Sequence, residues 1–273
     1  MARAKIRRLN AFCAALAVAW LLPIVWMAFN ALLTTQAFTG SAPLHFTLSN
    51  FEAALSMKDW GTAYLSSVVT ATITTAAVMA LAIPGAYALA KWPNRSGGAF
   101  ALLLGTRILP PASTVVAYVI FGSTLGIMDT WAALILAGLV MQVGWVTAVL
   151  AVSLAPYSSA LEDWLVSRGG NPLTAALLYI DVRARTQIFA LSMLCWLLQW
   201  GEFFFATALT GGGSSQTVTV LVAGFSTGQD IRWGPMFAAC ILAGAPVILT
   251  IVFASALFTR FLRRITRRDR AAF

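Results

Sequence analysis

Long apolar runs alternate with short polar connections along the whole chain. Stretches without a single charged residue cover residues 9–51, 60–90, 130–161, 186–201, 203–229 and 233–259. A helix needs about 20 mostly apolar residues to cross the hydrocarbon core of a bilayer. A helix at the surface of a soluble protein would show a polar stripe within two turns, and these runs contain no charged stripe. The pattern predicts an all-α, polytopic membrane protein.

Six membrane-spanning helices are expected, at about 9–33, 62–90, 99–123, 131–154, 186–209 and 235–259. The third is interrupted by Arg107 and by Pro110-Pro111. Helix-breaking prolines are tolerated in membranes where neighbouring helices satisfy the freed backbone groups. We expect Arg107 to extend toward the cytoplasmic face, where its span begins, with a position at a subunit interface as the alternative.

The composition agrees with this class and narrows the function. Of the 273 residues, 60% are apolar and 10% are charged, against roughly 45–50% and about 25% in soluble domains. The formal charge of +9 could indicate nucleic-acid binding. However, the basic residues flank apolar runs at both ends of the chain, which is typical of membrane orientation instead. We therefore expect the lipid bilayer and no nucleic acid as a partner.

The basic residues also predict the topology. With the N-terminus inside, fifteen Lys and Arg residues fall in inner segments and two, Lys58 and Arg232, fall in outer ones. We expect a cytoplasmic N-terminus (1–8), a transmembrane domain (9–260) with a cytoplasmic loop at 156–185, and a basic cytoplasmic tail (261–273). The first apolar run is too long for the core of a signal peptide, so it is expected to span the membrane.

Chemistry at a metal or cofactor is not expected. The three cysteines lie within apolar runs, the single histidine is His45, and no CxxC or Cys/His spacing occurs. There is no GxxxxGK[ST] loop that could hold ATP phosphates. We predict no catalytic residues, no metal site and no cofactor, and so no enzyme activity of the chain itself.

In an outer loop, Ser49 and Asn50 are expected to cap a short helix at 51–55.

The cytoplasmic loop at 156–185 has the local signals of two short helices. Ser159 and Glu162 fit a capping box, and Leu161 and Leu165 then share a face one turn apart. Gly169-Gly170 is expected to end this helix, and Asn171-Pro172 to start the next. Such helices would form a docking element for a cytoplasmic partner, the alternative being an amphipathic segment that rests on lipid.

The order of residues in this loop resembles a known element. Glu162-Asp163, followed by Gly169 and Pro172, is similar to the "EAA" loop of binding-protein-dependent ABC permeases. The resemblance implies that the loop sits in a groove of an ATPase subunit and transmits its nucleotide-driven closure to the spanning helices. It assigns ATPase coupling to one group of residues: Leu161, Glu162, Asp163, Leu165 and Gly169.

Further motifs, in the same order as in the maltose-type sugar permeases, extend the resemblance over about 45–260. They are residues 50–55, 85–90, 107–110, 125–130 and 199–203. The last resembles an aromatic-Asn-Glu-Phe element of the fifth span, so the resemblance places Gln199, Trp200, Glu202 and Phe203 along the translocation pathway. The sequence departs from the family pattern at four places. In the loop, Trp164 and Leu165 stand where the family has paired alanines, and Arg168 stands where it has an acid. Asp181-Val182 stands in place of a Leu-Pro, and Gly201 stands in place of the asparagine of the fifth span.

The expected function is therefore that of a permease subunit of an ATP-driven ABC importer for a sugar or sugar-like solute. Partner subunits would bind the ATP: the resemblance implies an ABC ATPase dimer, a homologous second permease chain and an extracytoplasmic solute-binding protein, in a bacterial cytoplasmic membrane. The alternative is a secondary, ion-coupled transporter, which needs buried carboxylates within the spans. Glu202 is the one candidate for that role.

Overall fold

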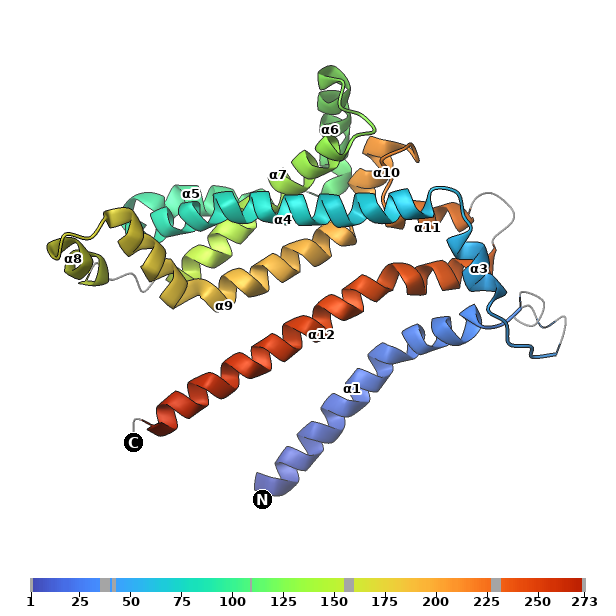
Figure 1. Ribbon diagram of the computed structural model, residues 1–273, viewed down its shortest axis with the longest axis horizontal. Coiled ribbons are helices and arrows are strands. Elements are labelled where there is room, and N and C mark those ends of the chain that lie inside the picture. The colour runs from blue at the N-terminus through green and yellow to red at the C-terminus, as the bar shows by residue number, and fades with distance from the viewer. Residues whose placement is uncertain are drawn as a thin grey trace. The chain divides into compact units, whose positions relative to one another are not determined.

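The computed structural model is all-helical in the part of the chain that it describes, residues 2–34, 40, 43–108, 110–154, 160–226 and 232–271. Within these ranges, extended pairing is limited to an isolated bridge between Leu33 and Phe46. The longer helices are α1 (Ala2–Ala31), α4 (Trp60–Lys91), α7 (Trp131–Leu154), α9 (Pro172–Trp200) and α12 (Trp233–Ala271) (Figure 1). The shorter ones are α3 (Ser49–Leu55), α5 (Pro93–Gly105), α6 (Pro111–Leu125), α8 (Ala160–Ser167), α10 (Phe204–Thr210), α11 (Val218–Ala223) and the 3₁₀ turn η1 (Gly224–Ser226).

Four helices are long and apolar enough to cross a membrane: Arg7–Ala31, Trp60–Lys91, Trp131–Leu154 and Trp233–Phe253. They correspond to the expected first, second, fourth and sixth spans. The expected fifth span is a bent pair, Ala184–Trp200 and Phe204–Thr210, with an angle of 51° between its halves. The described residues thus give four candidate spans, or five if the bent pair is one span, where the sequence predicted six.

The expected third span at 99–123 is not one helix. Helix α5 ends at Gly105, and α6 begins only at Pro111. Pro110 is extended, with φ −67° and ψ 139°, because a proline disfavours helical backbone in the residue before it and has no N–H to donate. With 15 residues, α6 is too short to cross the hydrocarbon core by itself.

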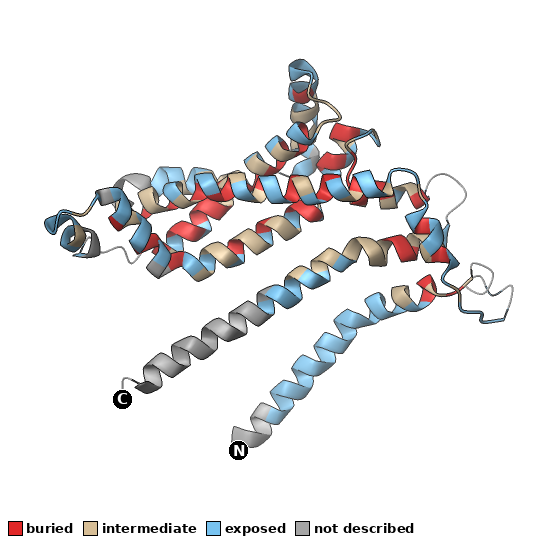
Figure 2. Ribbon diagram, viewed as in Figure 1, coloured by how far each residue is buried: buried red, intermediate tan, exposed pale blue. Residues whose placement is uncertain are grey.

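The chain divides into two compact units, and the larger contains residues 61–220 and 247–273. Its main core lies between α4, α7 and α9, with Val78, Leu150 and Cys195 fully buried. Buried positions gather along these three helices (Figure 2). Small polar residues of α4 connect that helix to other elements. Ser66 Oγ accepts a hydrogen bond from the indole of Trp131 at 2.9 Å, and Ser67 Oγ accepts one from Val218 N at 2.9 Å. Such small residues permit the close helix packing that membrane bundles require.

A second cluster of the same unit lies between α6, α7 and α10, around Leu134, Phe205 and Leu209. The connection after α6 is fixed beside it by Asp129. The Asp129 carboxylate accepts hydrogen bonds from Ser214 N at 2.9 Å, Ser214 Oγ at 3.1 Å and Ser215 N at 3.0 Å. The two segments that flank α7 and α10 are therefore joined across 85 residues of sequence.

The smaller unit contains residues 1–60 and 221–246. Its core is formed by Ala31, Ala54, Phe225 and Phe237. Asn50 is buried here and donates from Nδ2 to the carbonyls of Ala31 at 3.0 Å and Leu33 at 2.7 Å. The helix expected at 51–55 is present as α3, but the expected caps are wrong. It begins at Ser49 without a side-chain cap, because Asn50 instead satisfies free carbonyls at the end of α1.

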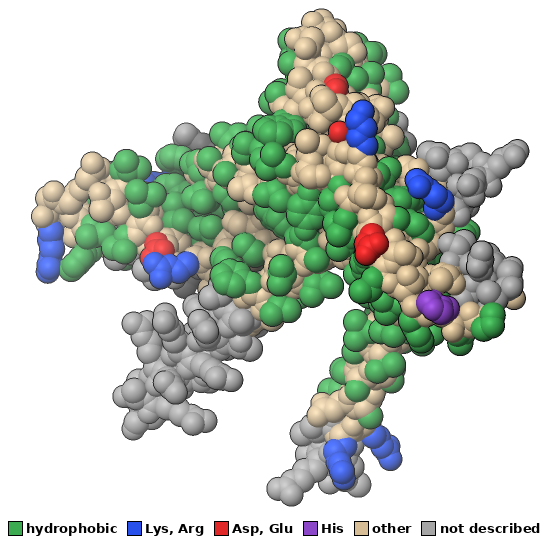
Figure 3. All heavy atoms as spheres, turned by 45° about the vertical axis from the view of Figure 1, so that its right-hand side comes forward, with side chains coloured by type: hydrophobic (Ala, Val, Ile, Leu, Met, Phe, Trp, Pro, Cys, Tyr) green, Lys and Arg blue, Asp and Glu red, His purple; other side chains and the backbone are tan. Residues whose placement is uncertain are grey.

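Large apolar side chains cover much of the surface. They include Leu9, Phe12, Trp20 and Val25 on α1, which is exposed over most of its length (Figure 2). On the face drawn in Figure 3, charged side chains are few and scattered among hydrophobic ones. An exposed apolar surface of this extent is typical of a chain that faces lipid or partner subunits rather than water.

Candidate functional site

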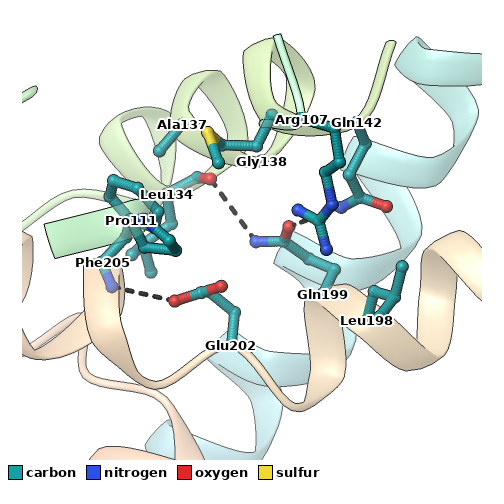
Figure 4. A pocket seen from close by; sticks show the side chains of 11 residues that line it. Arg107, Pro111, Leu134, Ala137, Gly138, Gln142, Leu198, Gln199, Glu202 and Phe205 are labelled. Atoms are coloured by element: carbon teal, nitrogen blue, oxygen red, sulfur yellow. Dashed lines mark hydrogen bonds between the residues drawn. The ribbon is translucent and has the colours of Figure 1, made fainter. Parts of the chain in front are cut away.

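A polar cavity of about 120 Å³ lies within the larger unit, against the middle of α7. Most of its wall is apolar, but four polar side chains converge on it: Arg107, Gln142, Gln199 and Glu202 (Figure 4). Polar groups that converge in an otherwise apolar pocket are the usual form of a small-molecule site. The other lining residues are Pro111, Leu134, Ala137, Gly138, Met141, Leu198 and Phe205.

Two helix breaks bring the charged side chains to this cavity. Arg107 lies in the turn between α5 and α6, and Glu202 lies in the turn between α9 and α10. Glu202 Oε1 accepts from Phe205 N at 2.9 Å, so the carboxylate satisfies a free N–H at the start of α10. The backbone carbonyl of Glu202 accepts a hydrogen bond from Thr219 Oγ1 at 3.0 Å. The break in the fifth span is thus specified by hydrogen bonds.

The two glutamines form a buried pair between α7 and α9. Gln142 Nε2 donates to Gln199 Oε1 at 3.0 Å, and Gln199 Nε2 donates to the Leu134 carbonyl at 3.5 Å. Their exposed fractions are 4% and 5%. Gly138 makes room for this pair, because a Cβ there would overlap the Gln199 amide and lie 2.9 Å from Thr74 Cγ2.

From the sequence, Arg107 was expected to extend toward the cytoplasmic face. Its exposed side chain lines the cavity beside Gln142 and Gln199 (Figure 4), and Gln142 lies halfway along α7. The break at Pro110 turns residues 106–108 out of the helix and toward α7. The position of Arg107 relative to the cytoplasmic face stays a prediction.

The four residues predicted along the pathway separate into two groups. Gln199 and Glu202 line the cavity. Trp200 is 3% exposed and packs away from the cavity. Its ring lies edge to face on Tyr64, with 5.3 Å between the ring centroids, and stacks on Trp196, with 5.1 Å between the centroids. Phe203 is 44% exposed and does not line the cavity.

Gln142 was not singled out from the sequence. The signal that could have identified it is a lone amide in the middle of an apolar 24-residue helix, where a polar side chain needs a partner within the protein. No group of three or more His, Cys, Asp or Glu side chains that could hold a metal ion occurs in the described ranges.

The loop expected on the cytoplasmic side, residues 156–185, is a second candidate site, and the geometry of its described turn follows the expectation. Helix α8 ends at Ser167, and Gly169 adopts φ +82°. Gly170 N donates to Leu165 O at 2.9 Å and Gly169 N to Val166 O at 2.9 Å, which is a Schellman motif. Asn171 Oδ1 then accepts from Leu173 N at 2.8 Å and caps α9.

The predicted coupling residues lie on α8 and in the turn after it. Asp163 is exposed and Leu165 is half-buried. The backbone of Leu161 and Glu162 belongs to α8, but their side chains lie outside the described part of the chain, as does Ser159 of the expected capping box. Trp164 is 50% exposed, and the Arg168 guanidinium lies 4.3 Å from its ring centroid.

The expected second short helix of the loop is wrong. Helix α9 continues without a break from Pro172 to Trp200, because the sequence between them has neither glycine nor proline to end it. It therefore leads directly from the turn at Gly169 to Gln199 at the cavity. With 29 residues it is about 43 Å long.

No family model matches this chain. It is 25% identical over 241 residues to the probable ABC transporter permease protein y4oR of Sinorhizobium fredii, covering 87% of this chain and 86% of that one. It is also 25% identical over 249 residues to the trehalose/maltose transport system permease protein MalG of Thermococcus litoralis, covering 87% of this chain and 88% of that one.

A solved structure agrees with these relatives at the level of the fold. A chain from the crystal structure of a bacterial ABC transporter involved in the import of the acidic polysaccharide alginate is 18% identical, with a TM-score of 0.76 over 94% of this chain and 97% of that chain. The resemblance expected from the motifs is confirmed: the curated homologues are ABC transporter permeases, sugar permeases among them. These homologues are transport subunits rather than enzymes.

Proposed function

We propose that this chain is the membrane-spanning permease subunit of an ATP-driven importer for a sugar or sugar-like solute in a bacterial cytoplasmic membrane. It crosses the membrane six times, with α5 and α6 together forming one interrupted crossing and both termini in the cytoplasm. A second permease chain completes the pathway, an ATPase dimer supplies the energy and an extracytoplasmic binding protein delivers the solute. The basic residues of the inner segments and the sugar permeases among the relatives support this proposal.

The observation that carries the proposal is the continuous connection from α8 to the cavity. Helix α8 presents an exposed Trp164 and Asp163, a surface suited to a protein groove. The turn at Gly169-Gly170 and the cap at Asn171 fix its direction relative to α9. Helix α9 ends at Trp200, next to the cavity residue Gln199. A rigid helix of this length can transmit a displacement of α8 to the polar cavity.

In this mechanism the chain performs no chemistry of its own. Closure of the ATPase dimer moves α8, and α9 transfers the movement to the break at Gly201–Phe203. The break is where the two halves of the fifth span change direction by 51°. Rigid-body movement about such a hinge would open the pathway alternately to the two sides of the membrane.

The sharpest test replaces Gly169 by valine. A β-branched residue is strained at φ +82°, by about 1–3 kcal/mol if the conformation persists. We expect the variant to redirect α8, so that uptake falls at least tenfold in proteoliposomes that contain the complete transporter. ATP hydrolysis should no longer respond to solute, while membrane insertion remains normal.

The matched control is Gly126→Val. Gly126 has φ +66° after the end of α6 and, like Gly169, has open space where a side chain would lie. It carries the same backbone strain, but lies away from the proposed ATPase surface, so coupling should be retained. Glu162→Lys, which reverses a charge on α8, should uncouple like Gly169→Val. Full solute-stimulated hydrolysis and uptake in both loop variants would contradict the proposal and favour a lipid-resting helix.

A further inference from the structure

The cavity holds two opposite charges that are not paired with each other. Among the described residues, the Arg107 side chain makes no hydrogen bond and no ion pair, and Glu202 accepts one backbone N–H. Each lies in a helix break rather than in a regular helix. Arg107 is exposed and Glu202 is half-buried, so both charged groups can reach a molecule that enters the cavity. The interrupted spans therefore bring one donor and one acceptor to the same small volume.

The two glutamines in the wall of the cavity hold each other in place. Gln142 Nε2 donates to Gln199 Oε1, and Gln199 Nε2 donates to the Leu134 carbonyl. Gln142 Oε1 has no hydrogen bond within the described residues, but it has almost no accessible surface, so a molecule in the cavity does not touch it. Gln142 therefore acts on the cavity by positioning Gln199.

We infer that this cavity is a solute-contact site within this subunit, and that it takes an uncharged, hydroxyl-bearing part of the solute. A hydroxyl group both donates and accepts, so vicinal hydroxyls match a guanidinium on one side and a carboxylate oxygen on the other. The charges of Arg107 and Glu202 cancel, so the cavity does not favour a charged group. This inference rests on the proposed function, and it assigns Arg107 and Glu202 to binding and Gln142 to the positioning of Gln199.

The volume limits what can enter. About 120 Å³ holds several water molecules, which is room for the hydroxyl-bearing edge of one sugar ring but not for an oligosaccharide. The site would therefore contact one sugar unit during passage, with other units elsewhere along the pathway. A carboxylate on that unit would be repelled by Glu202 and attracted by Arg107, so removal of either charge should change how well an acidic unit passes.

The test compares a neutral sugar with an acidic form of the same sugar. The neutral probe is maltose or trehalose, whichever the wild-type complex takes up faster, and the acidic probe is that sugar oxidised to a carboxylate at C6. Initial uptake rates are measured in proteoliposomes with the same binding protein throughout. The preference of the binding protein then cancels when the ratio of neutral to acidic uptake is compared between variants.

The two charge variants should shift this ratio in opposite directions. Glu202→Gln removes the repulsion of the acidic probe but keeps an oxygen that accepts from Phe205 N. Uptake of the acidic probe should therefore rise about fivefold relative to uptake of the neutral probe. Arg107→Gln should disfavour the acidic probe by a similar factor, while Arg107→Lys retains the wild-type ratio. A purely structural role would lower both rates together in every variant.

Gln142→Leu and Gln216→Leu complete the design. Gln142→Leu removes the donor that holds Gln199 at the cavity wall and should lower uptake of the neutral probe about tenfold. Gln216 is a buried amide of the same unit outside the cavity, so Gln216→Leu should leave uptake within twofold. Wild-type uptake of the neutral probe with unshifted ratios in both charge variants would overturn this inference alone. If neither maltose nor trehalose is taken up, the comparison is made with a neutral sugar that the wild-type complex does transport; uptake of no neutral sugar at all would overturn the proposed sugar transport and this inference with it.

Discussion

The turn at α8 and the polar cavity lie at opposite ends of α9, and they are held by different kinds of interaction. The turn depends on hydrogen bonds between residues at most five apart in sequence, such as Gly170 N to Leu165 O. The cavity depends on contacts such as that of Gln142 with Gln199, which are 57 residues apart. The turn can therefore form as soon as its own segment folds, whereas the cavity forms only when several helices have packed.

This difference determines how each region responds to substitution. In the turn, a side chain at Gly169 would meet no neighbouring atom, so the cost there is conformational. At the cavity, a side chain at Gly138 would meet two neighbours, so the cost there is steric. Substitutions that separate these two costs test whether the regions are independent.

The largest effect is expected for Gly138→Ala. The added methyl group would overlap the Gln199 amide and approach Thr74, which should displace Gln199 and break its bond with Gln142. Overpacking of this kind costs about 1–3 kcal/mol. We expect a lower midpoint of thermal unfolding in detergent, together with slower sugar uptake.

The control for this variant is Gly61→Ala. Gly61 lies in the first turn of α4 with open space around it, so alanine there should stabilise slightly through helix propensity, by about 0.5–1 kcal/mol. If Gly138→Ala unfolds at the same temperature as Gly61→Ala, then the close approach of α7 and α9 at this point is not structurally important.

A smaller effect is expected at the other end of α9. Asn171→Ala removes the side-chain oxygen that accepts from Leu173 N, at a cost of about 1 kcal/mol. Loss of the cap should let the first turn of α9 fray, which hydrogen exchange of residues 173–176 would detect. Transport should become partly uncoupled from hydrolysis. Asn171→Ser retains a cap and should behave as wild type, and equal exchange in Ala and Ser variants would argue against a role for the cap.

The same contrast explains what the sequence could predict. Gly169 and Asn171 were identified correctly because the turn and cap are local and each has a characteristic residue. The four long apolar helices and the one bent pair of the described residues also follow from composition, since length and hydropathy are properties of a single segment. The interruption at Pro110-Pro111 was visible in the sequence, but its consequence for Arg107 was not.

Positions that depend on packing were missed. Arg107 lines the cavity beside α7, and nothing local in the sequence signals the displacement of residues 106–108 toward that helix. Trp200 and Gln199 are adjacent in sequence, yet only Gln199 lines the cavity. Helical geometry turns successive residues by about 100°, so a motif places its residues near a site without saying which of them enter it.

The smallest effect is expected at Asp129, which is a second long-range contact but lies near the surface. Partial burial by itself raises the pKa of the Asp129 carboxyl, but hydrogen bonds from the Ser215 and Ser214 amides and the Ser214 hydroxyl lower it more, so that its pKa lies below the usual value. Because the folded-state pKa is lowered, the ionised carboxylate stabilises the fold above the unfolded pKa of about 3.9. This contribution is lost as the pH falls through the folded-state pKa.

Asp129→Asn tests this contact with little change in shape. Asparagine tolerates the positive φ of 54° at this position, but it has one acceptor oxygen in place of the two that bind Ser214 and Ser215. We expect a slightly lower unfolding temperature in detergent at pH 7, with the difference from wild type constant down to about pH 5 and smaller below about pH 4. A difference that is unchanged at pH 3.5 would mean that the charge of Asp129 does not hold the two segments together. The contact would then depend on the shape of the side chain and on uncharged hydrogen bonds, such as the one between Gln142 and Gln199 that joins α7 and α9.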